Sequence, residues 1–336
     1  MLRQGLGLAL IMLIVIWLYE SFVPPPPKIC GTPGGPPVTG PRILLRDGRH
    51  LSYKEYGVPK HIAKFKIIFL HGHSTNKKDT FLASQGLFAE FQVYIVGFDR
   101  PGYGESDPDS RRTVKSTILD VEELVDHLEL GQKIHVMGYS AGGFYVWGCL
   151  KYIPHRLEGA ILIAPGVNFW WPQLPSSLVE EAFHQQSSWS LWNYLIAHYS
   201  PWLMYWWNTQ NYFEPKMSKY RLTELDPDEE NLLDYSTQQG LYESYLRDEI
   251  ITFGEWEFEP LDLEDAFVGD ESLVVHLWQG GNDSVVPVVL QRYIVERLSW
   301  VHYHEVPNGG HKFALDDIIK HQIFKTLVVN EPIVSA

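Results

Sequence analysis

The chain has 336 residues, and about 295 remain after an atypical N-terminal stretch, enough for one large domain with a substantial core. Its formal net charge is −14, with 41 acidic against 27 basic residues, and no Lys/Arg cluster is present, which argues against nucleic-acid binding. With only two cysteines the chain has no disulfide framework, and no Cys/His spacing resembles a zinc site.

The N-terminus differs from the rest of the chain. Residues 5–19 form an almost unbroken apolar run of 15 residues, a length between those of a signal-peptide core and a membrane span. No small-residue cleavage site precedes the prolines that follow, and Trp17, Tyr19 and Phe22 resemble an interfacial aromatic belt. The sequence therefore predicts an uncleaved membrane anchor over residues 1–23.

The next segment is rich in proline and glycine. Residues 24–41 contain eight prolines in 18 positions, a composition that predicts a semi-extended spacer without a core of its own. Residues 42–51 then read as an antiparallel hairpin around an Asp-Gly turn. We expect the folded part of the chain to begin with this hairpin.

Two predicted strands in the first half lead into loops that could support chemistry. Residues 66–70 are a buried strand that runs into His71-Gly72-His73, and residues 93–98 are a second strand. The second strand leads into Asp99-Arg100-Pro101-Gly102-Tyr103-Gly104. Asp99 and Arg100 are interpreted as structural residues that brace their loop.

The most informative motif is a G-x-S-x-G pattern over residues 138–142. The sequence predicts a strand over residues 133–137, a tight turn, and a helix that starts at Ala141. Glycines lack a Cβ atom, so strand and helix can close around a strained serine whose hydroxyl is exposed at the turn. The backbone N–H of Ala141 would then point toward developing negative charge. Taken alone, the pattern could also be a purely structural turn at Ser140.

A serine becomes a good nucleophile only with a base and a group that orients that base. In this arrangement the expected chain order is serine, acid, histidine. A predicted strand over residues 273–278 runs into a loop that carries Asp283, and a strand over residues 302–306 is followed by His311. Either residue alone could be ordinary surface, but loops after parallel strands gather at one sheet edge. We therefore predict Ser140, Asp283 and His311 as nucleophile, acid and base.

Together these motifs resemble the α/β-hydrolase superfamily in its serine-nucleophile form, HG…DxPGxGxS…GxSxG…GxxDxxxP…GGH. The resemblance implies an α/β fold with about eight, mostly parallel strands, flanking helices and a helical cap insertion. It implies that Ser140, Asp283 and His311 are the catalytic triad, and that the backbone N–H groups of His73 and Ala141 form the oxyanion hole. With its N-terminal anchor, the chain further resembles membrane-anchored plant members.

The resemblance divides the folded part of the chain into three segments. These are the first part of the hydrolase core, the helical cap, and the second part of the core, at residues 42–166, 167–267 and 268–336. Seven of the 12 tryptophans fall between residues 170 and 207, where they could be cap core, a wall for an apolar substrate, or a bilayer contact. The family usually has an apolar residue at the position of His73, whose ring either lies near the leaving group or, as favoured here, hydrogen-bonds the loop.

The combined reading is a serine hydrolase that cleaves a small apolar ester or lipid through an acyl-enzyme on Ser140. No metal or organic cofactor is expected, and the oligomeric state stays open. Two alternatives on the same fold are a non-hydrolytic small-molecule receptor and a hydroxynitrile-lyase-like enzyme. The intact triad favours hydrolysis over the receptor, because a binding protein needs no converging catalytic residues.

Localisation follows from the N-terminus. We expect a single-pass protein of an endomembrane, and the side of the membrane on which the catalytic domain lies is left open. The positive charges on the two sides of the predicted anchor are nearly equal in number, so the positive-inside rule does not determine its orientation. The only N-x-S/T sequon is Asn282-Asp283-Ser284, and a glycan on Asn282 would block the site at Asp283. The chain also has few cysteines. Both observations slightly favour the cytosolic side for the catalytic domain.

Overall fold

The computed structural model of the chain describes residues 11–13, 17, 19–79, 84–210, 233–263 and 273–328. The strands are β1 (Arg42–Leu44), β2 (His50–Gly57), β3 (Phe65–Leu70), β4 (Val93–Phe98), β5 (Ile134–Tyr139), β6 (Leu157–Ile163), β7 (Val274–Gly280) and β8 (Val301–Val306). The α-helices are α2 (Gln85–Phe91), α3 (Val114–His127), α4 (Gly142–Tyr152), α5 (Ser176–Gln185), α6 (Ser188–Tyr199), α7 (Met204–Thr209), α10 (Arg247–Phe253), α11 (Val288–Val295) and α12 (Asp317–Lys325). Shorter helical segments are η1 (Pro154–Arg156), η2 (Pro201–Leu203), the π-helix η3 (Tyr242–Leu246), η4 (Pro260–Leu263) and η5 (Phe313–Leu315).

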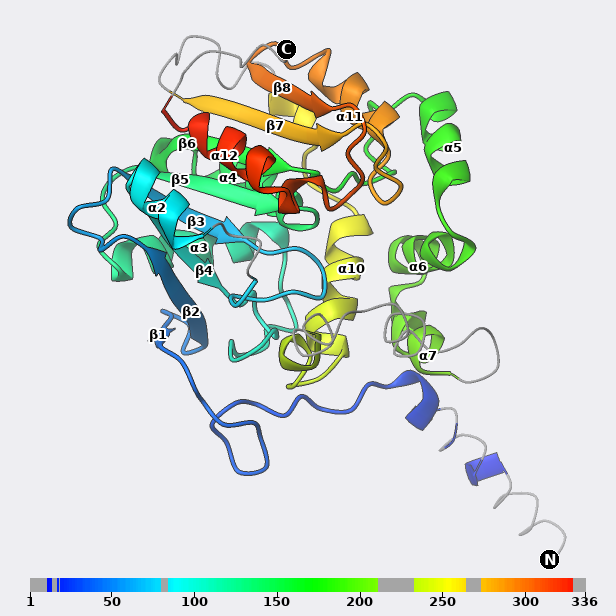
Figure 1. Cartoon of the computed structure of the whole chain (residues 1–336). Coiled ribbons are helices and arrows are strands. Elements are labelled where there is room, and N and C mark those ends of the chain that lie inside the picture. The colour runs from blue at the N-terminus through cyan, green and yellow to red at the C-terminus, as the bar shows by residue number, and fades with distance from the viewer. Residues whose placement is uncertain are drawn as a thin grey trace, which may run out of the picture.

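All these strands join one eight-stranded sheet in the order β1-β2-β4-β3-β5-β6-β7-β8 (Figure 1). β2 is antiparallel to both of its neighbours, and every other pairing is parallel. The prediction of about eight, mostly parallel strands is confirmed, and so is the opening hairpin, whose turn contains Gly48 at φ +88°. Because parallel strands end at one edge, the loops that follow β3, β5, β7 and β8 lie along the same side of the sheet.

Alternating side chains of the central strands separate two layers of core. Ile68 and Leu70 of β3 belong to a cluster shared with α3, α4 and α11, whereas Ile67 and Phe69 face a second cluster shared with α2 and α12. The helices therefore cover both faces of the sheet (Figure 1). A strand that is buried on both faces reads as a continuous apolar run, which is the pattern of β3 and β4 in the sequence.

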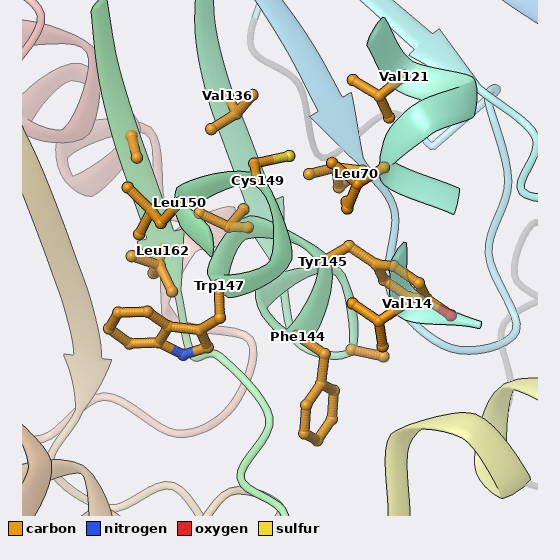
Figure 2. Close-up of a cluster of buried hydrophobic side chains, with 14 of the residues drawn as sticks. Leu70, Val114, Val121, Val136, Phe144, Tyr145, Trp147, Cys149, Leu150 and Leu162 are labelled. Atoms are coloured by element: carbon orange, nitrogen blue, oxygen red, sulfur yellow. The ribbon is translucent and has the colours of Figure 1, made fainter. Parts of the chain in front are cut away.

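Helix α4, which begins just after Ser140, is the most deeply buried helix of this core (Figure 2). Its residues from Gly142 to Leu150 are all buried, and the side chains of Tyr145 and Trp147 have no exposed surface. Burial of a large apolar side chain stabilises the folded state by about 2–3 kcal/mol. The helix therefore holds the turn at Ser140 on a rigid support.

The chain between β6 and β7, called the insertion below, carries α5, α6, α7, η3, α10 and η4 and lies beyond the ends of the strands (Figure 1). Its tryptophans serve more than one purpose. Trp171 is 3% exposed and belongs to the main core, and the ring of Trp170 stacks on His198 at 4.1 Å. Trp192 and Trp202 are exposed. Part of the aromatic cluster is thus internal packing of the insertion.

The predicted single-pass membrane anchor, and the membrane localisation that rested on it, are contradicted by the structure. Across the described stretches of the chain, no helix is long and apolar enough to cross a bilayer. The described end of the segment packs on protein instead: the ring of Phe22 lies 5.9 Å from that of Trp202 and 5.7 Å from that of Trp206. Residues 1–10, 14–16 and 18 of the predicted anchor lie outside the described ones.

The proline-rich segment has no helix or strand between Pro24 and Pro41, yet it is hydrogen-bonded to the folded protein. The backbone N–H of Lys28 donates to the Gln239 carbonyl at 2.7 Å, and the N–H of Cys30 donates to the Gln239 side chain at 2.9 Å. Further along, the N–H of Thr39 donates to the Glu105 carboxylate at 3.0 Å. The segment expected to be a spacer is therefore fixed to both the insertion and the core.

Candidate active site

The turn between β5 and α4 holds Ser140 in a strained conformation. Ser140 has φ +53°, in the left-handed region that side chains other than glycine rarely adopt. Its N–H donates to the Ile163 carbonyl at 2.9 Å, which ties the turn to β6. Gly142 makes the turn possible, because a Cβ atom there would lie 1.9 Å from the Leu70 carbonyl oxygen. The strand, the turn and the helix occur where the sequence predicted them, within one or two residues.

The three residues predicted as a triad are brought together from three separate loops. Nε2 of His311 lies 3.0 Å from Oγ of Ser140, and Nδ1 of His311 lies 2.8 Å from Oδ2 of Asp283. Both distances are within hydrogen-bond range. One imidazole therefore connects the serine hydroxyl to a carboxylate whose side chain is fully buried.

The Asp283 carboxylate is held by donors on both of its oxygens. Oδ2 accepts from Nε2 of Gln279 at 3.1 Å in addition to His311, and Oδ1 accepts the backbone N–H groups of Val285 at 2.8 Å and Val286 at 2.9 Å. Several donors on one carboxylate leave it little freedom to rotate. No motif or spacing in the sequence indicated Gln279 as a partner of the acid.

The loops that carry the acid and the histidine are bound to each other. The N–H of Asn282 donates to the Gly309 carbonyl at 2.9 Å. His311 is fixed from its other side by Tyr139, whose hydroxyl donates to the His311 carbonyl at 3.1 Å and whose ring lies 5.3 Å from the imidazole. Tyr139 is the first of the two variable residues of the G-x-S-x-G motif, and its identity in the sequence did not reveal this contact.

The residues predicted for the oxyanion hole lie on the two sides of Ser140. Ala141 is the N-cap residue of α4, so its N–H belongs to the helix end where donors lack intrahelical partners. A Cβ atom built on Gly72 would be 3.5 Å from Cβ of Ser140, which puts the backbone just before His73 beside the serine. Ala141 follows Ser140 in the chain, and Gly72 brings the backbone before His73 close to it, so both predicted donors belong to segments beside the serine.

The loop from His71 to His73 is supported from beneath by Arg100. The guanidinium, which has no exposed surface, donates to the carbonyls of His71 and, at 3.0 Å, Gly72. The backbone N–H of Arg100 donates to Nε2 of His71 at 3.2 Å, and burial and the Arg100 charge hold the pKa of His71 well below its ordinary value. The sequence interpretation placed Arg100 as a structural residue of its own loop, whereas these contacts are with the loop that carries His73.

The side chain of His73 points toward the insertion. Its Nδ1 lies 3.4 Å from Oε1 of the buried Glu249, and its ring lies 5.6 Å from that of Tyr245. Neither residue was singled out in the sequence, because a position far along the chain in a helical segment has no local signal that identifies its partner. The sequence analysis considered two roles for the His73 ring, a hydrogen bond to its loop and a place near the leaving group. Neither role included a contact with Glu249.

The described part of the chain contains neither a cluster of metal-binding side chains nor a reactive thiol. Among those residues, no group of three or more His, Cys, Asp or Glu side chains is arranged to hold a metal ion. Cys30 and Cys149 are both buried free thiols. Burial, with a smaller contribution from Glu105, raises the pKa of Cys30 to about 11, and burial also raises the pKa of Cys149, so both favour the unreactive thiol form.

Comparison with known proteins adds to this geometry. The model of the alpha/beta hydrolase family matches residues 67–317, which is well over half of the chain. The chain belongs to the alpha/beta hydrolase family. This family member is also 33% identical over 125 residues to the abhydrolase domain-containing protein abhd-5.2 of Caenorhabditis elegans. That alignment covers 34% of the chain and only 27% of the nematode protein. The expected resemblance to membrane-anchored plant members is not shown by these comparisons.

Solved structures share the fold of this alpha/beta hydrolase. A hydrolase from Pseudomonas aeruginosa superposes with a TM-score of 0.55 at 18% identity, covering 86% of this chain and 96% of the other. A thermophilic esterase from Thermogutta terrifontis has a TM-score of 0.55 at 17% identity, with coverages of 87% and 98%. An esterase from Exiguobacterium antarcticum superposes with a TM-score of 0.55 at 17% identity, covering 86% of this chain and 98% of the other. At such identities the likeness shows the fold.

Proposed function

We propose that this alpha/beta hydrolase is a serine hydrolase that cleaves ester bonds, with Ser140 as nucleophile, His311 as base and Asp283 as acid. The observation that carries the proposal is the continuous relay from Asp283 through His311 to Ser140, at 2.8 and 3.0 Å. The strained φ of Ser140, +53°, supports the same role, because strain at a non-glycine residue concentrates at functional sites.

The proposed reaction runs in two halves. Oγ of Ser140 attacks the ester carbonyl while its proton passes to Nε2 of His311, and Asp283 stabilises the imidazolium through the Nδ1 hydrogen bond. Collapse of the tetrahedral intermediate breaks the ester C–O bond, and His311 gives its proton to the leaving alcohol. In the second half His311 takes a proton from water, the resulting hydroxide attacks the acyl-enzyme, and Ser140 is released with its proton restored.

The negative oxygen of each tetrahedral intermediate would be bound by the backbone N–H groups of His73 and Ala141. Loss of one such donor costs about 10²–10³ in turnover in serine hydrolases, so this contact is a large part of the expected catalysis. The proximity of Gly72 to Ser140 and the N-cap position of Ala141 support this assignment.

The substrate class follows from the surroundings of the site. We propose that residues 167–267 act as a cap over the core segments 42–166 and 268–336, and that the substrate is a lipophilic ester. The Tyr245 ring against His73 and the tryptophan-rich composition of the insertion support an apolar acyl or alcohol group. Two of the proteins of similar fold are named esterases, and ester cleavage by this chain is part of the proposal.

The decisive experiment is labelling with a fluorophosphonate probe, followed by hydrolysis of p-nitrophenyl esters of increasing chain length. Wild type and the Ser110→Ala variant, which changes an exposed serine outside the site, should be labelled, and Ser140→Ala should not. Labelling of Ser140→Ala at the wild-type rate would refute the nucleophile. Equal rates for acetyl and octanoyl esters would refute the lipophilic preference while leaving the serine mechanism in place.

A further inference from the structure

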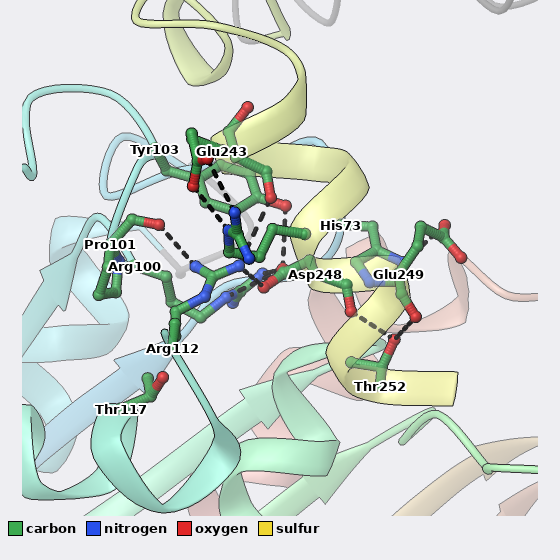
Figure 3. Close-up of polar contacts among 12 residues, drawn as sticks. His73, Arg100, Pro101, Tyr103, Arg112, Thr117, Glu243, Asp248, Glu249 and Thr252 are labelled. Atoms are coloured by element: carbon green, nitrogen blue, oxygen red, sulfur yellow. Dashed lines mark hydrogen bonds and ion pairs between the residues drawn. The ribbon is translucent and has the colours of Figure 1, made fainter. Parts of the chain in front are cut away.

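Two consecutive acidic residues of the insertion reach the loop beside Ser140 by different routes (Figure 3). Asp248 and Glu249 are adjacent in α10, and the side chains of both are buried, at 0% and 4% exposed. Successive residues of an α-helix point about 100° apart, so neighbours contact different partners. Asp248 meets Arg100, and Glu249 meets His73.

Asp248 is the centre of a dense buried network. Its Oδ2 accepts from Nε of Arg100 at 3.1 Å and from the Tyr103 hydroxyl at 2.9 Å, and its Oδ1 accepts from Nη2 of Arg112 at 2.7 Å and the Tyr145 hydroxyl at 2.7 Å. Burial alone would raise the pKa of Asp248, but the two guanidinium groups hold it well below its ordinary value. The carboxylate is therefore charged, and it fixes the orientation of Arg100.

Arg100 transmits this orientation to the active site. The same guanidinium that pairs with Asp248 donates to the carbonyls of His71 and Gly72, the two residues before the proposed oxyanion donor His73. An oxyanion donor must lie within a few tenths of an ångström of its working position to stabilise a tetrahedral intermediate. Because Arg100 fixes the carbonyls of His71 and Gly72, it also fixes the peptide planes that determine where the N–H of His73 points.

The net charge of this buried cluster depends on Glu249 as well as on Asp248. Arg100 and Arg112 both have fully buried side chains, so Asp248 by itself would leave one positive charge uncompensated inside the protein. An uncompensated buried charge is strongly unfavourable. Glu249 supplies a second buried carboxylate, whose Oε1 lies 3.4 Å from Nδ1 of His73.

The local helix geometry supports this double contact. The segment before α10 is a π-helix, η3, over Tyr242–Leu246. A π-helical turn shifts the register of the residues that follow, and such turns often occur at functional sites. The same segment carries Tyr245, the ring of which lies against His73.

We propose that α10 of the insertion sets the geometry of the oxyanion loop, with Asp248 and Glu249 as positioning residues that act through Arg100 and His73. This inference rests on the proposed serine mechanism and adds regulation of the same site. Any displacement of α10, by substrate entering under the insertion or leaving it, changes both contacts at once. Substrate binding by the insertion is thereby coupled to catalysis at Ser140.

The test uses Glu249→Gln in the full chain, because this change removes the charge and keeps the shape. The matched control is Glu259→Gln, which neutralises a second buried carboxylate of the insertion that binds the Gln173 N–H and does not contact the loop. We expect Glu249→Gln to lower both kcat for a p-nitrophenyl ester and the rate constant of fluorophosphonate labelling about tenfold, with KM changed less than twofold. Glu259→Gln should leave all three values unchanged.

A double-mutant cycle identifies the route. If Glu249 acts through the His73 ring, Glu249→Gln has no further effect on kcat in a His73→Leu background. The inference is overturned if Glu249→Gln is labelled as fast as wild type, or if kcat falls only in proportion to a lowered melting temperature. Failure of the proposed function is a separate result, since wild type would then show no labelling that depends on Ser140.

Discussion

Gly142 and Leu70 approach so closely that no side chain fits between them: a Cβ atom on Gly142 would stand 1.9 Å from the Leu70 carbonyl oxygen. This contact joins the first turn of α4 to the end of β3. It therefore brings the serine turn and the loop beginning at His71 to the same place. The glycine of the G-x-S-x-G motif is required for packing between elements as much as for the turn itself.

Gly142→Ala is accordingly expected to be strongly destabilising, because backbone atoms on both elements have to move. We expect a loss of about 3 kcal/mol or more in the free energy of unfolding, at the upper end of overpacking effects. Gly86→Ala is the matched control, since Gly86 lies within α2 and its nearest neighbour is Oγ of Ser84 at 3.8 Å. Urea unfolding of both variants checks the expectation, and similar stability of the two would contradict it.

Ser140 and His311 should behave as one unit. Because the serine depends on His311 to remove its proton, His311→Ala already disables the nucleophile. Each single alanine variant is expected to lower kcat by several orders of magnitude, and the double variant by no more than the worse single one. Single-turnover assays with a soluble ester measure this. Losses that multiply in the double variant would show that the two residues do not share a step.

Asp283→Asn probes the orientation of the base. Each carboxylate oxygen of Asp283 accepts two donors, from Gln279 and His311 on one side and from Val285 and Val286 on the other. An amide NH₂ would face a pair of donors in either orientation, and His311 would lose the acceptor that selects its tautomer. We expect kcat to fall by about 10³–10⁴.

The control for that variant is Asp262→Asn, which alters an exposed aspartate of the insertion that binds the side chain of Gln173. Its kcat should equal that of wild type. If Asp283→Asn retains more than a tenth of wild-type turnover while the fold is intact, Asp283 is not the residue that orients the base.

The sequence predicted much of the fold and the residues that form the relay, for identifiable physical reasons. Buried parallel strands leave continuous apolar runs, and a serine turn needs glycines at fixed positions, so β3, β5 and the turn at Ser140 can be located locally. Asp283 and His311 followed from chain order and from the rule that loops after parallel strands share an edge.

Other features could not be read in this way. The pairings of Asp248 with Arg100 and of Glu249 with His73 join positions far apart in the chain, and a helical acidic residue carries no mark of its partner. The N-terminal prediction was wrong for a related reason. Apolar and aromatic residues such as Phe22 suit a bilayer and a protein surface equally well, and composition does not distinguish these two environments.

Acid should destabilise the protein through buried histidines on the strands. Burial lowers the pKa of His135 to about 4, and burial together with His304 and His302 lowers the pKa of His276 to about 3. The folded state keeps these rings neutral, whereas the unfolded chain binds protons below about pH 6.5. The unfolded state then holds more protons, so stability is retained above pH 6.5 and falls as the pH drops toward 4.

The expected change is a few kcal/mol in the free energy of unfolding between pH 6.5 and pH 4, the sum of at most about 3 kcal/mol per buried ring. Urea unfolding at a series of pH values measures the slope. His135→Gln should flatten it, because one proton-binding group of the unfolded chain is removed. An unchanged slope in His135→Gln would show that this ring is protonated equally in both states.

The proline-rich segment should stabilise the folded protein. Glu105 is fully buried and accepts hydrogen bonds from the backbone N–H groups of Thr39 at 3.0 Å and Gly40 at 3.1 Å, and from Nζ of Lys77 at 3.0 Å. Burial would raise the pKa of Glu105, but the bonds from Thr39 and Lys77 lower it to about 2. Deletion of residues 1–41 removes two backbone donors from a buried carboxylate, and each lost bond to a charged group costs about 1.5–3 kcal/mol.

We therefore expect deletion of residues 1–41 to lower the melting temperature by about 6–24 °C, given about 2–4 °C per kcal/mol for a large domain. Deletion of residues 1–23 is the control, because it leaves the bonds to Glu105 and Gln239 in place and, among the contacts described for this segment, removes the packing of Phe22 on the insertion. Differential scanning calorimetry compares the two truncations with the full chain. If the two truncated proteins have the same melting temperature, residues 24–41 are a passive spacer. Their hydrogen bonds would then contribute nothing to stability beyond what bonds to water supply.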